Sequence, residues 1–295
     1  MNLEKLATET RNKQTMHLDE LSVLEIMKLM NKEDQTVAEK VALEIPQITK
    51  VVNTIIKSFN QEGRLIYMGA GTSGRLGVLD AAECVPTFSV NPSMVQGLIA
   101  GGMKAMTVAV EGAEDSKELG EEDLKTIGLT EKDTVIGIAA SGRTPYVIGG
   151  LEYAKKVGAA TATLSCNKNA EISQYAQLPI EVEVGPEVLT GSTRLKSGTA
   201  QKLVLNMLST GAMIGVGKVY QNLMVDVKPS NKKLEERSKR IIMEATECSY
   251  QEASETFEKA NHQVKLAIVM ILTRSSKEEA EKKLVEAKGF IRKTI

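Results

Sequence analysis

Cysteine, histidine and surplus charge are scarce in this chain of 295 residues, and each scarcity excludes a class of function. The three cysteines, Cys84, Cys166 and Cys248, are far apart and lack the spacing of metal ligands, so we expect reduced thiols and no metal site. The formal net charge is only -1. Because nucleic acid and anionic membranes each require a concentrated basic face, the sequence predicts neither as a partner.

Long apolar runs are also missing. None reaches the ~18 residues that a membrane-spanning helix needs, and residues 1–15 lack the apolar core of a signal peptide. We therefore expect a cytoplasmic protein. Because 42% of its residues are hydrophobic, the chain can bury a large core, and its length favours one α/β domain with smaller helical parts.

Short apolar runs alternate with helical patterns in the middle of the chain. We expect strands at 64–68, about 87–90, 134–140, 160–165 and 179–184. This alternation is typical of a parallel sheet that helices cover on both faces. The predicted fold is of the α/β class, a three-layer α/β/α sandwich around a mainly parallel five-stranded sheet.

Helices are predicted before and after this sheet. Apolar residues at helical spacing predict N-terminal helices over about 21–30 and 48–59, and a long helix from Thr193 to about Gly215. A polar break at 227–231 then precedes further helical patterns. We therefore expect one domain over 1–230 and a small helical domain over 231–295.

Two of the predicted strands run directly into glycine turns that are rich in hydroxyl groups. The first turn is Gly69-Ala70-Gly71-Thr72-Ser73-Gly74, and the second is Ser141-Gly142-Arg143-Thr144. Thr144 and Pro145 suit the N-cap and first turn of a helix. Because a helix start offers unpaired N–H groups and the positive end of the helix dipole, two such turns predict a phosphorylated ligand.

A nucleotide is a poor candidate for that ligand. The first turn matches the dinucleotide fingerprint G-x-G-x-x-G, but residues 87–92 lack the acidic residue that such a site needs about 20 residues further on. Gly217-Lys218 is followed by Val219, which lacks the hydroxyl of a P-loop. The sequence therefore favours a small phosphate ester.

The two turns resemble the sugar isomerase (SIS) domain, which binds phosphorylated sugars. Residues 185–202, Gly-Pro-Glu-Val-Leu-Thr-Gly-Ser-Thr-Arg-Leu-Lys-Ser-Gly-Thr-Ala-Gln-Lys, resemble the signature that N-acetylmuramic acid 6-phosphate etherases share with glucokinase regulatory proteins. The resemblance covers nearly the whole chain, including residues 8–12, 79–84, 99–102 and 111–116. It favours the etherase family.

The resemblance implies a lyase that removes D-lactate from C3 of N-acetylmuramic acid 6-phosphate and leaves N-acetylglucosamine 6-phosphate. In the ring-opened sugar the C1 aldehyde acidifies the C2 proton, so elimination of the ether and addition of water need no metal or redox cofactor. The resemblance implies Glu83 as the acid that protonates lactate and later activates water, and Glu114 as the group that acts at C2. It also implies a homodimer with its site near the subunit contact.

Candidate binding residues lie in the turns and in the signature. Phosphate binding is assigned to Thr72, Ser73, Ser141, Gly142 and Thr144, with helix capping as the alternative for each hydroxyl. The signature supplies further candidates for sugar or phosphate contact, with a salt bridge or a solvated charge as the alternative for the lysine: Ser192, Thr193, Arg194 and Lys196. We expect a surface or packing role for His262 and assign none to His17.

Glu83 presents a geometric difficulty. A single helix from Ser73 to Glu83 would place the carboxylate about 15 Å from the first turn, farther than a hexose reaches. Either the helix bends or ends early, or Glu83 serves the sugar held by a neighbouring subunit, which we favour. The apolar residues around Glu83 are compatible with burial that raises its pKa, whereas its alternative role is that of a surface carboxylate.

Three other functions use some of the same features. A sugar-phosphate aldose–ketose isomerase would employ the same turns and an enolising base, and a non-catalytic sugar-phosphate-sensing regulator would bind without turnover. A DNA-binding repressor is disfavoured because residues 1–63 carry 8 Lys+Arg against 10 Asp+Glu.

Overall fold

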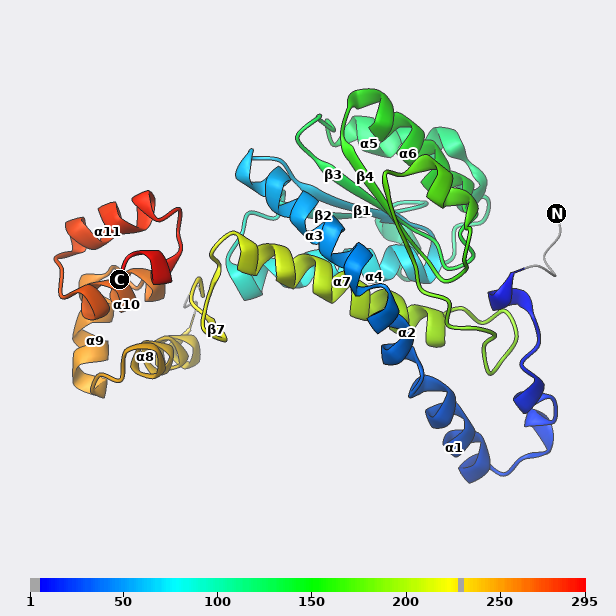
Figure 1. Cartoon of the computed structure of the whole chain (residues 1–295), viewed down its shortest axis with the longest axis horizontal. Coiled ribbons are helices and arrows are strands. Elements are labelled where there is room, and N and C mark those ends of the chain that lie inside the picture. Colours follow the sequence, from blue (N-terminus) through cyan, green and yellow to red (C-terminus); the bar gives the residue numbers. More distant parts are fainter. Residues whose placement is uncertain (1–5, 228–230) are drawn as a thin grey trace. The chain divides into compact units, whose positions relative to one another are not determined.

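The computed structural model describes residues 6–227 and 231–295 (Figure 1). The chain divides into two compact units, one made of residues up to Ala82 together with Ser93–Ser209, the other of Glu83–Pro92 together with Thr210–Ile295. The domain boundary that we expected at residue 230 falls among residues 228–230, outside the described part of the chain.

A five-stranded parallel sheet forms the centre of the first unit. Every pairing between neighbouring strands is parallel. The strands lie side by side in the order β2 (Val95–Ile99), β1 (Leu65–Gly69), β3 (Thr134–Ile138), β4 (Ala160–Ser165) and β5 (Leu178–Glu181). All residues of β1 and β3 are buried, as expected of strands covered on both faces.

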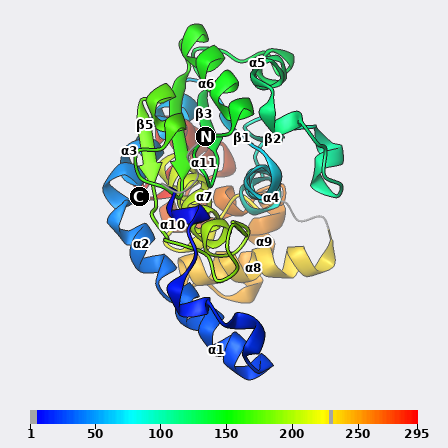
Figure 2. The same cartoon turned by 90° about the vertical axis from the view of Figure 1, so that its right-hand side faces the viewer.

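Helices cover both faces of this sheet, which confirms the predicted α/β/α sandwich. Figures 1 and 2 show α5 and α6 over one face and α3 over the other. The helices of this unit are α1 (Val23–Asp34), α2 (Val37–Leu43), α3 (Ile45–Asn60), α5 (Lys117–Thr126) and α6 (Pro145–Val157), while α4 (Gly71–Phe88) and α7 (Lys196–Gly215) continue into the second unit. Short 3-10 turns lie at Ala7–Glu9, Lys13–Thr15, Leu18–Glu20, Met103–Met106, Ala113–Asp115 and Glu171–Tyr175.

The strand predicted at about 87–90 is wrong. Helix α4 continues to Phe88, and the edge strand β2 begins only at Val95. Gln96 and Gly97 interrupt the apolar run of β2, so its sequence does not show the pattern that predicts a buried strand. The glycine is required there because a Cβ at position 97 would lie 2.5 Å from the Cα of Val78 in α4.

The second unit has a small hydrophobic core of its own. Phe257, Ile242, Ile268 and Val269 are buried at its centre. Its elements are the hairpin β6 (Val219–Tyr220) and β7 (Leu223–Met224), the helices α8 (Lys232–Thr246), α9 (Tyr250–Lys259), α10 (Val264–Thr273) and α11 (Lys277–Glu286), and a 3-10 turn at Ile291–Lys293. None of the helices in the described ranges combines the length and the apolar character needed to cross a membrane.

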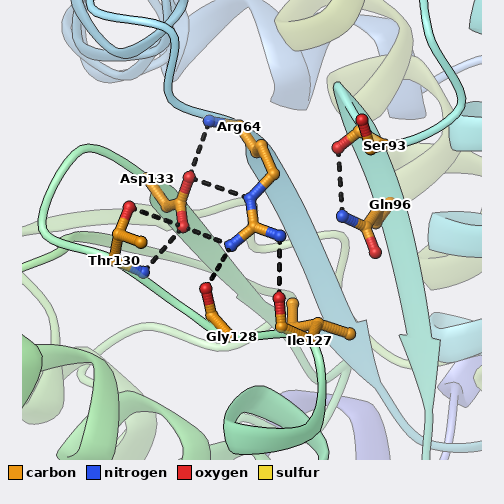
Figure 3. Close-up of polar contacts among 7 residues, drawn as sticks. All are labelled: Arg64, Ser93, Gln96, Ile127, Gly128, Thr130 and Asp133. Carbon is orange, nitrogen blue, oxygen red and sulfur yellow. Dashed lines mark hydrogen bonds and ion pairs between the residues drawn. The ribbon is translucent and has the colours of Figure 1, made fainter.

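An ion pair joins the amino ends of β1 and β3 (Figure 3). The Arg64 Nη2 atom lies 2.7 Å from Oδ2 of the buried Asp133, and the Arg64 guanidinium also donates to the carbonyl oxygens of Ile127 and Gly128. Burial acts to raise the pKa of Asp133, but hydrogen bonds from Arg64 and from the Thr130 backbone outweigh it and lower this pKa. The ionised pair therefore holds the two strands in register.

Polar contacts join α4 to α7 within the first unit. The Ser73 Oγ atom donates to Gln201 Oε1 at 3.0 Å, and Ser209 Oγ donates to Asp80 Oδ1 at 3.2 Å. Because the earlier residue of each helix meets the earlier residue of the other, the helices run parallel and start at the same edge of the sheet. Burial raises the pKa of Asp80, which also accepts a hydrogen bond from Tyr67.

Replacing Arg64 by methionine should lower the free energy of unfolding by about 3–5 kcal/mol, because the buried Asp133 carboxylate then loses its charged partner. Urea unfolding at pH 7 measures the change. Since the pKa of Asp133 is lowered in the fold, the loss should shrink as the pH falls through that pKa. The matched control is Lys57→Met, which removes an exposed lysine from α3, and equal small losses in both variants would contradict this role.

Replacing Asp80 by asparagine should stabilise the fold more at neutral than at acidic pH. The pKa of Asp80 is raised on folding. Below the unfolded pKa of about 3.9 the carboxyl group is protonated in both states and does not disfavour folding. As the pH rises from there through the folded pKa, ionisation of the buried carboxyl group increasingly disfavours folding. The gain of Asp80→Asn over the parent chain should therefore grow upward from about pH 4 and then level off. Thermal unfolding across a pH series, with the exposed Asp34→Asn as control, measures it, and a gain that falls with rising pH would refute this account.

Candidate active site

The pairing of β1 with β3 brings the two glycine turns to the same edge of the sheet. Gly69, the last residue of β1, lies opposite Ile138, the last residue of β3. Helix α4 begins at Gly71, inside the first turn, and α6 begins at Pro145, directly after the second. Both predicted helix starts are confirmed, so two sets of unpaired N–H groups lie at neighbouring strand ends.

The first turn depends on its glycines for close packing. A Cβ at Gly69 would lie 2.8 Å from the Ile138 carbonyl oxygen, and a Cβ at Gly74 would lie 2.6 Å from the Gly69 carbonyl oxygen. Thr72 is half-buried, whereas Ser73 is buried and directs its hydroxyl to Gln201 in α7. The Ser73 hydroxyl therefore bonds to a neighbouring helix.

The second turn requires a glycine for its backbone conformation. Gly142 has a φ of 75°, in the left-handed region, and a Cβ there would lie 2.5 Å from the Cβ of Ala170. Thr144 occupies the N-cap position of α6 as predicted, but its side chain makes no capping hydrogen bond. Ser141 and Thr144 are both half-buried at this edge of the sheet.

Asn167, which no sequence motif singled out, joins the second turn to the N-terminal segment. Its buried Nδ2 atom donates to the carbonyl oxygens of Ala140 and Ser141 and to Thr8 Oγ1. The Thr8 backbone N–H donates back to Asn167 Oδ1 at 3.3 Å. The available signal was its position two residues after β4, which ends at the same edge of the sheet as β1 and β3.

The signature segment forms the start of α7 and lies beside the first turn. A Cβ at Gly198 would lie 3.6 Å both from Thr72 Cγ2 and from the Thr193 carbonyl oxygen, so this glycine borders both candidate residues. The fully buried Glu187 accepts the backbone N–H groups of Lys196 and Ser197, each at 2.9 Å. A carboxylate of the chain itself therefore occupies the amino end of α7. Ser192 is half-buried in the preceding loop.

Lys196 forms a salt bridge, which was one of the alternatives to its predicted contact with the substrate. Its Nζ atom lies 2.6 Å from Glu33 Oε2 of α1, and the lysine side chain is only 3% exposed. Asn12 Nδ2 donates to the same Glu33 oxygen at 3.0 Å. A buried ammonium group needs such a partner, and this pair ties α1 to the start of α7. Contact between Lys196 and a substrate stays a prediction.

A cavity of about 250 Å³ opens beside the first turn and includes Glu114 in its wall. Glu114 is exposed and lies in the 3-10 turn Ala113–Asp115. The cavity is also lined by Gly71, by Glu111 and by Arg75, whose Nη2 atom donates to the Ala105 carbonyl oxygen at 2.8 Å. The structure thus places one of the two predicted catalytic glutamates next to a predicted phosphate turn.

Glu83, unlike Glu114, does not line the cavity beside the first turn. Helix α4 is continuous from Gly71 to Phe88, so it does not end early, and Glu83 stands ten residues after Ser73, about 15 Å along the helix. The Glu83 side chain is exposed, as are Ala82 and Pro86. Of the other apolar neighbours that were compatible with burial of this carboxyl group, Ala81 is buried and Val85 is half-buried, but the Glu83 side chain itself faces solvent in the single chain.

Neither histidine lines the cavity beside the first turn. His17 is exposed and lies 3.2 Å from Glu20. In the second unit, His262 lies 3.3 Å from Glu258 and packs its ring against Phe257, which confirms its surface and packing role. Within the described residues, no group of three or more His, Cys, Asp or Glu side chains is arranged to hold a metal ion.

Two family models match the chain. The N-terminal SIS domain of glucokinase regulatory protein matches residues 47–155, and the SIS domain matches residues 103–211. A solved structure from Bacteroides fragilis NCTC 9343, provisionally assigned as a phosphosugar isomerase involved in capsule formation, has a TM-score of 0.51. It covers 67% of this chain and 94% of its own at 16% identity, which shows the shared fold.

Curated relatives match this chain from end to end. The chain is 72% identical over 295 residues to N-acetylmuramic acid 6-phosphate etherase 2 of Enterococcus faecalis and 68% identical over 295 residues to that of Lactiplantibacillus plantarum, with 100% of each chain covered. It is 69% identical over 293 residues to the N-acetylmuramic acid 6-phosphate etherase of Bacillus cereus strain AH187, covering 99% of this chain and 100% of the relative. The resemblance seen in the motifs is confirmed: the chain belongs to the N-acetylmuramic acid 6-phosphate etherase family.

Proposed function

We propose that this chain cleaves the D-lactyl ether of N-acetylmuramic acid 6-phosphate with water, giving N-acetylglucosamine 6-phosphate and D-lactate. The observation that carries the proposal is the 68–72% identity to named etherases over the full length of the chain. The position of Glu114 in a cavity beside the first glycine turn supports it. Such a reaction serves the recovery of cell-wall amino sugars in the cytoplasm.

The phosphate group is assigned to the edge where the two turns meet. Backbone N–H groups at the starts of α4 and α6 can donate to a dianion, and the hydroxyls of Thr72, Ser73, Ser141 and Thr144 add donors. Gly142 is assigned to the phosphate as well, because a glycine has no side chain of its own to hold a ligand away from the backbone. Ser192 and Thr193, in the loop before α7, are assigned to the sugar.

The chemistry needs a base at C2 and an acid at the ether oxygen. Removal of the C2 proton in the open-chain aldehyde expels the lactyl group from C3, and water then adds to the unsaturated aldehyde. Glu114 is assigned to the C2 proton because its turn lies against the cavity beside the phosphate. Glu83 is assigned to the lactyl oxygen and then to water, since an alkoxide leaves only after protonation.

A homodimer brings Glu83 to the sugar held by the partner subunit. Glu83 lies about 15 Å along α4 from the turn of its own chain, too far for one hexose to bridge. A dimer is further supported by α1, which has no buried residue and leaves Val23 75%, Leu24 63% and Met27 51% exposed. Apolar side chains gathered on one exposed helix are typical of a surface that a second copy covers.

Substituting either glutamate by glutamine should reduce D-lactate release by about 10²–10⁴, because each substitution removes a proton-transfer group and preserves side-chain size. Lactate is measured enzymatically, with the exposed Glu122→Gln in α5 as control.

Turnover of the parent chain in H₂¹⁸O should place the label at C3 of the sugar. Label in the lactate, or isomerisation of the sugar without lactate release, would refute the proposed reaction.

Mixing two inactive variants should restore activity if the site is shared. One variant carries Glu83→Gln, and the other carries Thr72→Ala with Ser141→Ala. After exchange of subunits, about one site in four should be intact, because each mixed dimer combines a whole phosphate turn with a whole Glu83. The recovered rate is compared with each variant alone. Activity no greater than the sum of the two would show that each chain uses its own Glu83.

A further inference from the structure

The guanidinium group of Arg75 is fixed in the wall of the cavity beside the first turn. Its Nε atom donates to the Met106 carbonyl oxygen at 3.0 Å, and its Nη2 atom donates to the Ala105 carbonyl oxygen at 2.8 Å. Both carbonyl groups belong to the 3-10 turn Met103–Met106, which follows β2. Because the guanidinium group is planar and rigid, these two bonds also fix the position of its remaining N–H groups.

Arg75 is a half-buried cation without an anionic partner. A guanidinium group has five N–H donors, and the two bonds to the 3-10 turn leave three of them, including both on Nη1. Within the described part of the chain, no carboxylate forms an ion pair with Arg75, which is also the one cation in the wall of this cavity. Since charged groups that lose contact with water are usually paired, the cavity presents a prepared place for an anion.

The order of the strands separates Arg75 from the second glycine turn. In the sheet, β1 lies between β2 and β3. The second glycine turn follows β3, whereas the carbonyl groups that hold Arg75 follow β2. The guanidinium group is therefore held on the β2 side of the first turn, while the phosphate is assigned to the side where the first and second turns meet. The anion that suits Arg75 is a second acidic group of the same ligand.

The rest of the cavity wall indicates what that group carries. Small apolar residues line it beside Arg75 and Glu114, namely Ala100, Ala105, Ala109 and Val110. An arginine next to small apolar side chains suits a carboxylate that bears a methyl group, and the D-lactyl group has both. The lactyl ether is attached at C3, which is bonded to C2, the atom at which Glu114 is assigned to act.

We propose that Arg75 binds the lactyl carboxylate of N-acetylmuramic acid 6-phosphate and so selects sugar phosphates that carry this group. The N–H groups that the 3-10 turn leaves free donate to the carboxylate oxygens, a pairing that is stronger than a neutral hydrogen bond. The alanine side chains contact the lactyl methyl group. No bond is made or broken at Arg75, which determines specificity. The inference rests on the proposed function, because it takes its ligand from that reaction.

Two sugar alcohols that differ in the lactyl group alone test this assignment. Reduction at C1 removes the aldehyde that elimination needs, so N-acetylmuramitol 6-phosphate and N-acetylglucosaminitol 6-phosphate bind without turnover. Calorimetry measures the Kd of each. Arg75→Met should raise the Kd of the lactyl compound about tenfold to a hundredfold, because it removes a charge-assisted contact. The Kd of the compound without a lactyl group should stay within about twofold.

Lys104→Met is the matched control. Lys104 lies in the same 3-10 turn as the carbonyl groups that hold Arg75, but it is exposed and does not line the cavity. Loss of its charge should therefore leave both Kd values within about twofold. An equal rise for both sugar alcohols in Arg75→Met would overturn the proposal, because a phosphate contact or a displaced turn affects both compounds alike.

The parent chain provides a test that does not depend on the folding of a variant. Conversion of the lactyl carboxylate of N-acetylmuramitol 6-phosphate to its amide removes the negative charge and nearly preserves the shape. The parent should bind this amide about tenfold or more weakly than the acid, whereas Arg75→Met should bind the acid and the amide alike. An amide that binds the parent as tightly as the acid would refute the contact.

Failure of this inference and failure of the proposed reaction give different results. A parent chain that prefers the lactyl sugar alcohol but releases no lactate from N-acetylmuramic acid 6-phosphate would refute the reaction alone. A parent chain that releases lactate but binds both sugar alcohols equally, or binds neither, would refute the role of Arg75 alone.

Discussion

The parallel pairing of β1 with β3 is the constraint on which the candidate site depends. It sets Gly69 opposite Ile138, so the two hydroxyl-rich turns leave the sheet at the same edge. The Arg64–Asp133 ion pair holds the other ends of the same two strands. Because a slip of one residue would turn every side chain to the opposite face, both buried strands and the ion pair oppose such a slip.

Electrostatics then determines which helix starts remain for an anion. The start of α7 holds the Glu187 carboxylate, and the nearby Lys196 ammonium is paired with Glu33. Glu187 and Lys196 of the signature segment are therefore already engaged within the chain. The starts of α4 and α6 are the remaining candidates, because peptide dipoles and hydroxyl groups at a helix start favour an anion.

Sequence patterns predicted the parts of the fold in which local and tertiary preferences agree. Four of the five strands were near their observed places, as in 64–68 against Leu65–Gly69. Three of them, β1, β3 and β4, have apolar runs that are buried almost throughout. The edge strand β2 was misplaced because Gly97, which lets α4 approach closely, interrupts the apolar pattern by which a strand is predicted. Helix α2 was missed because it is short, and the role of Asn167 depends on contacts with Thr8, far away in the chain.

The sequence by itself determined the chemistry at the strand ends and the family, because glycine turns, hydroxyl groups and signature residues are local in the chain. Only the tertiary structure decided which of these groups meet. It placed Glu114 beside the first turn, paired Lys196 with Glu33 and left Glu83 exposed along a continuous helix. The physical reason is that burial and ion pairing depend on segments brought together by folding, and spacing along one chain does not encode those distances.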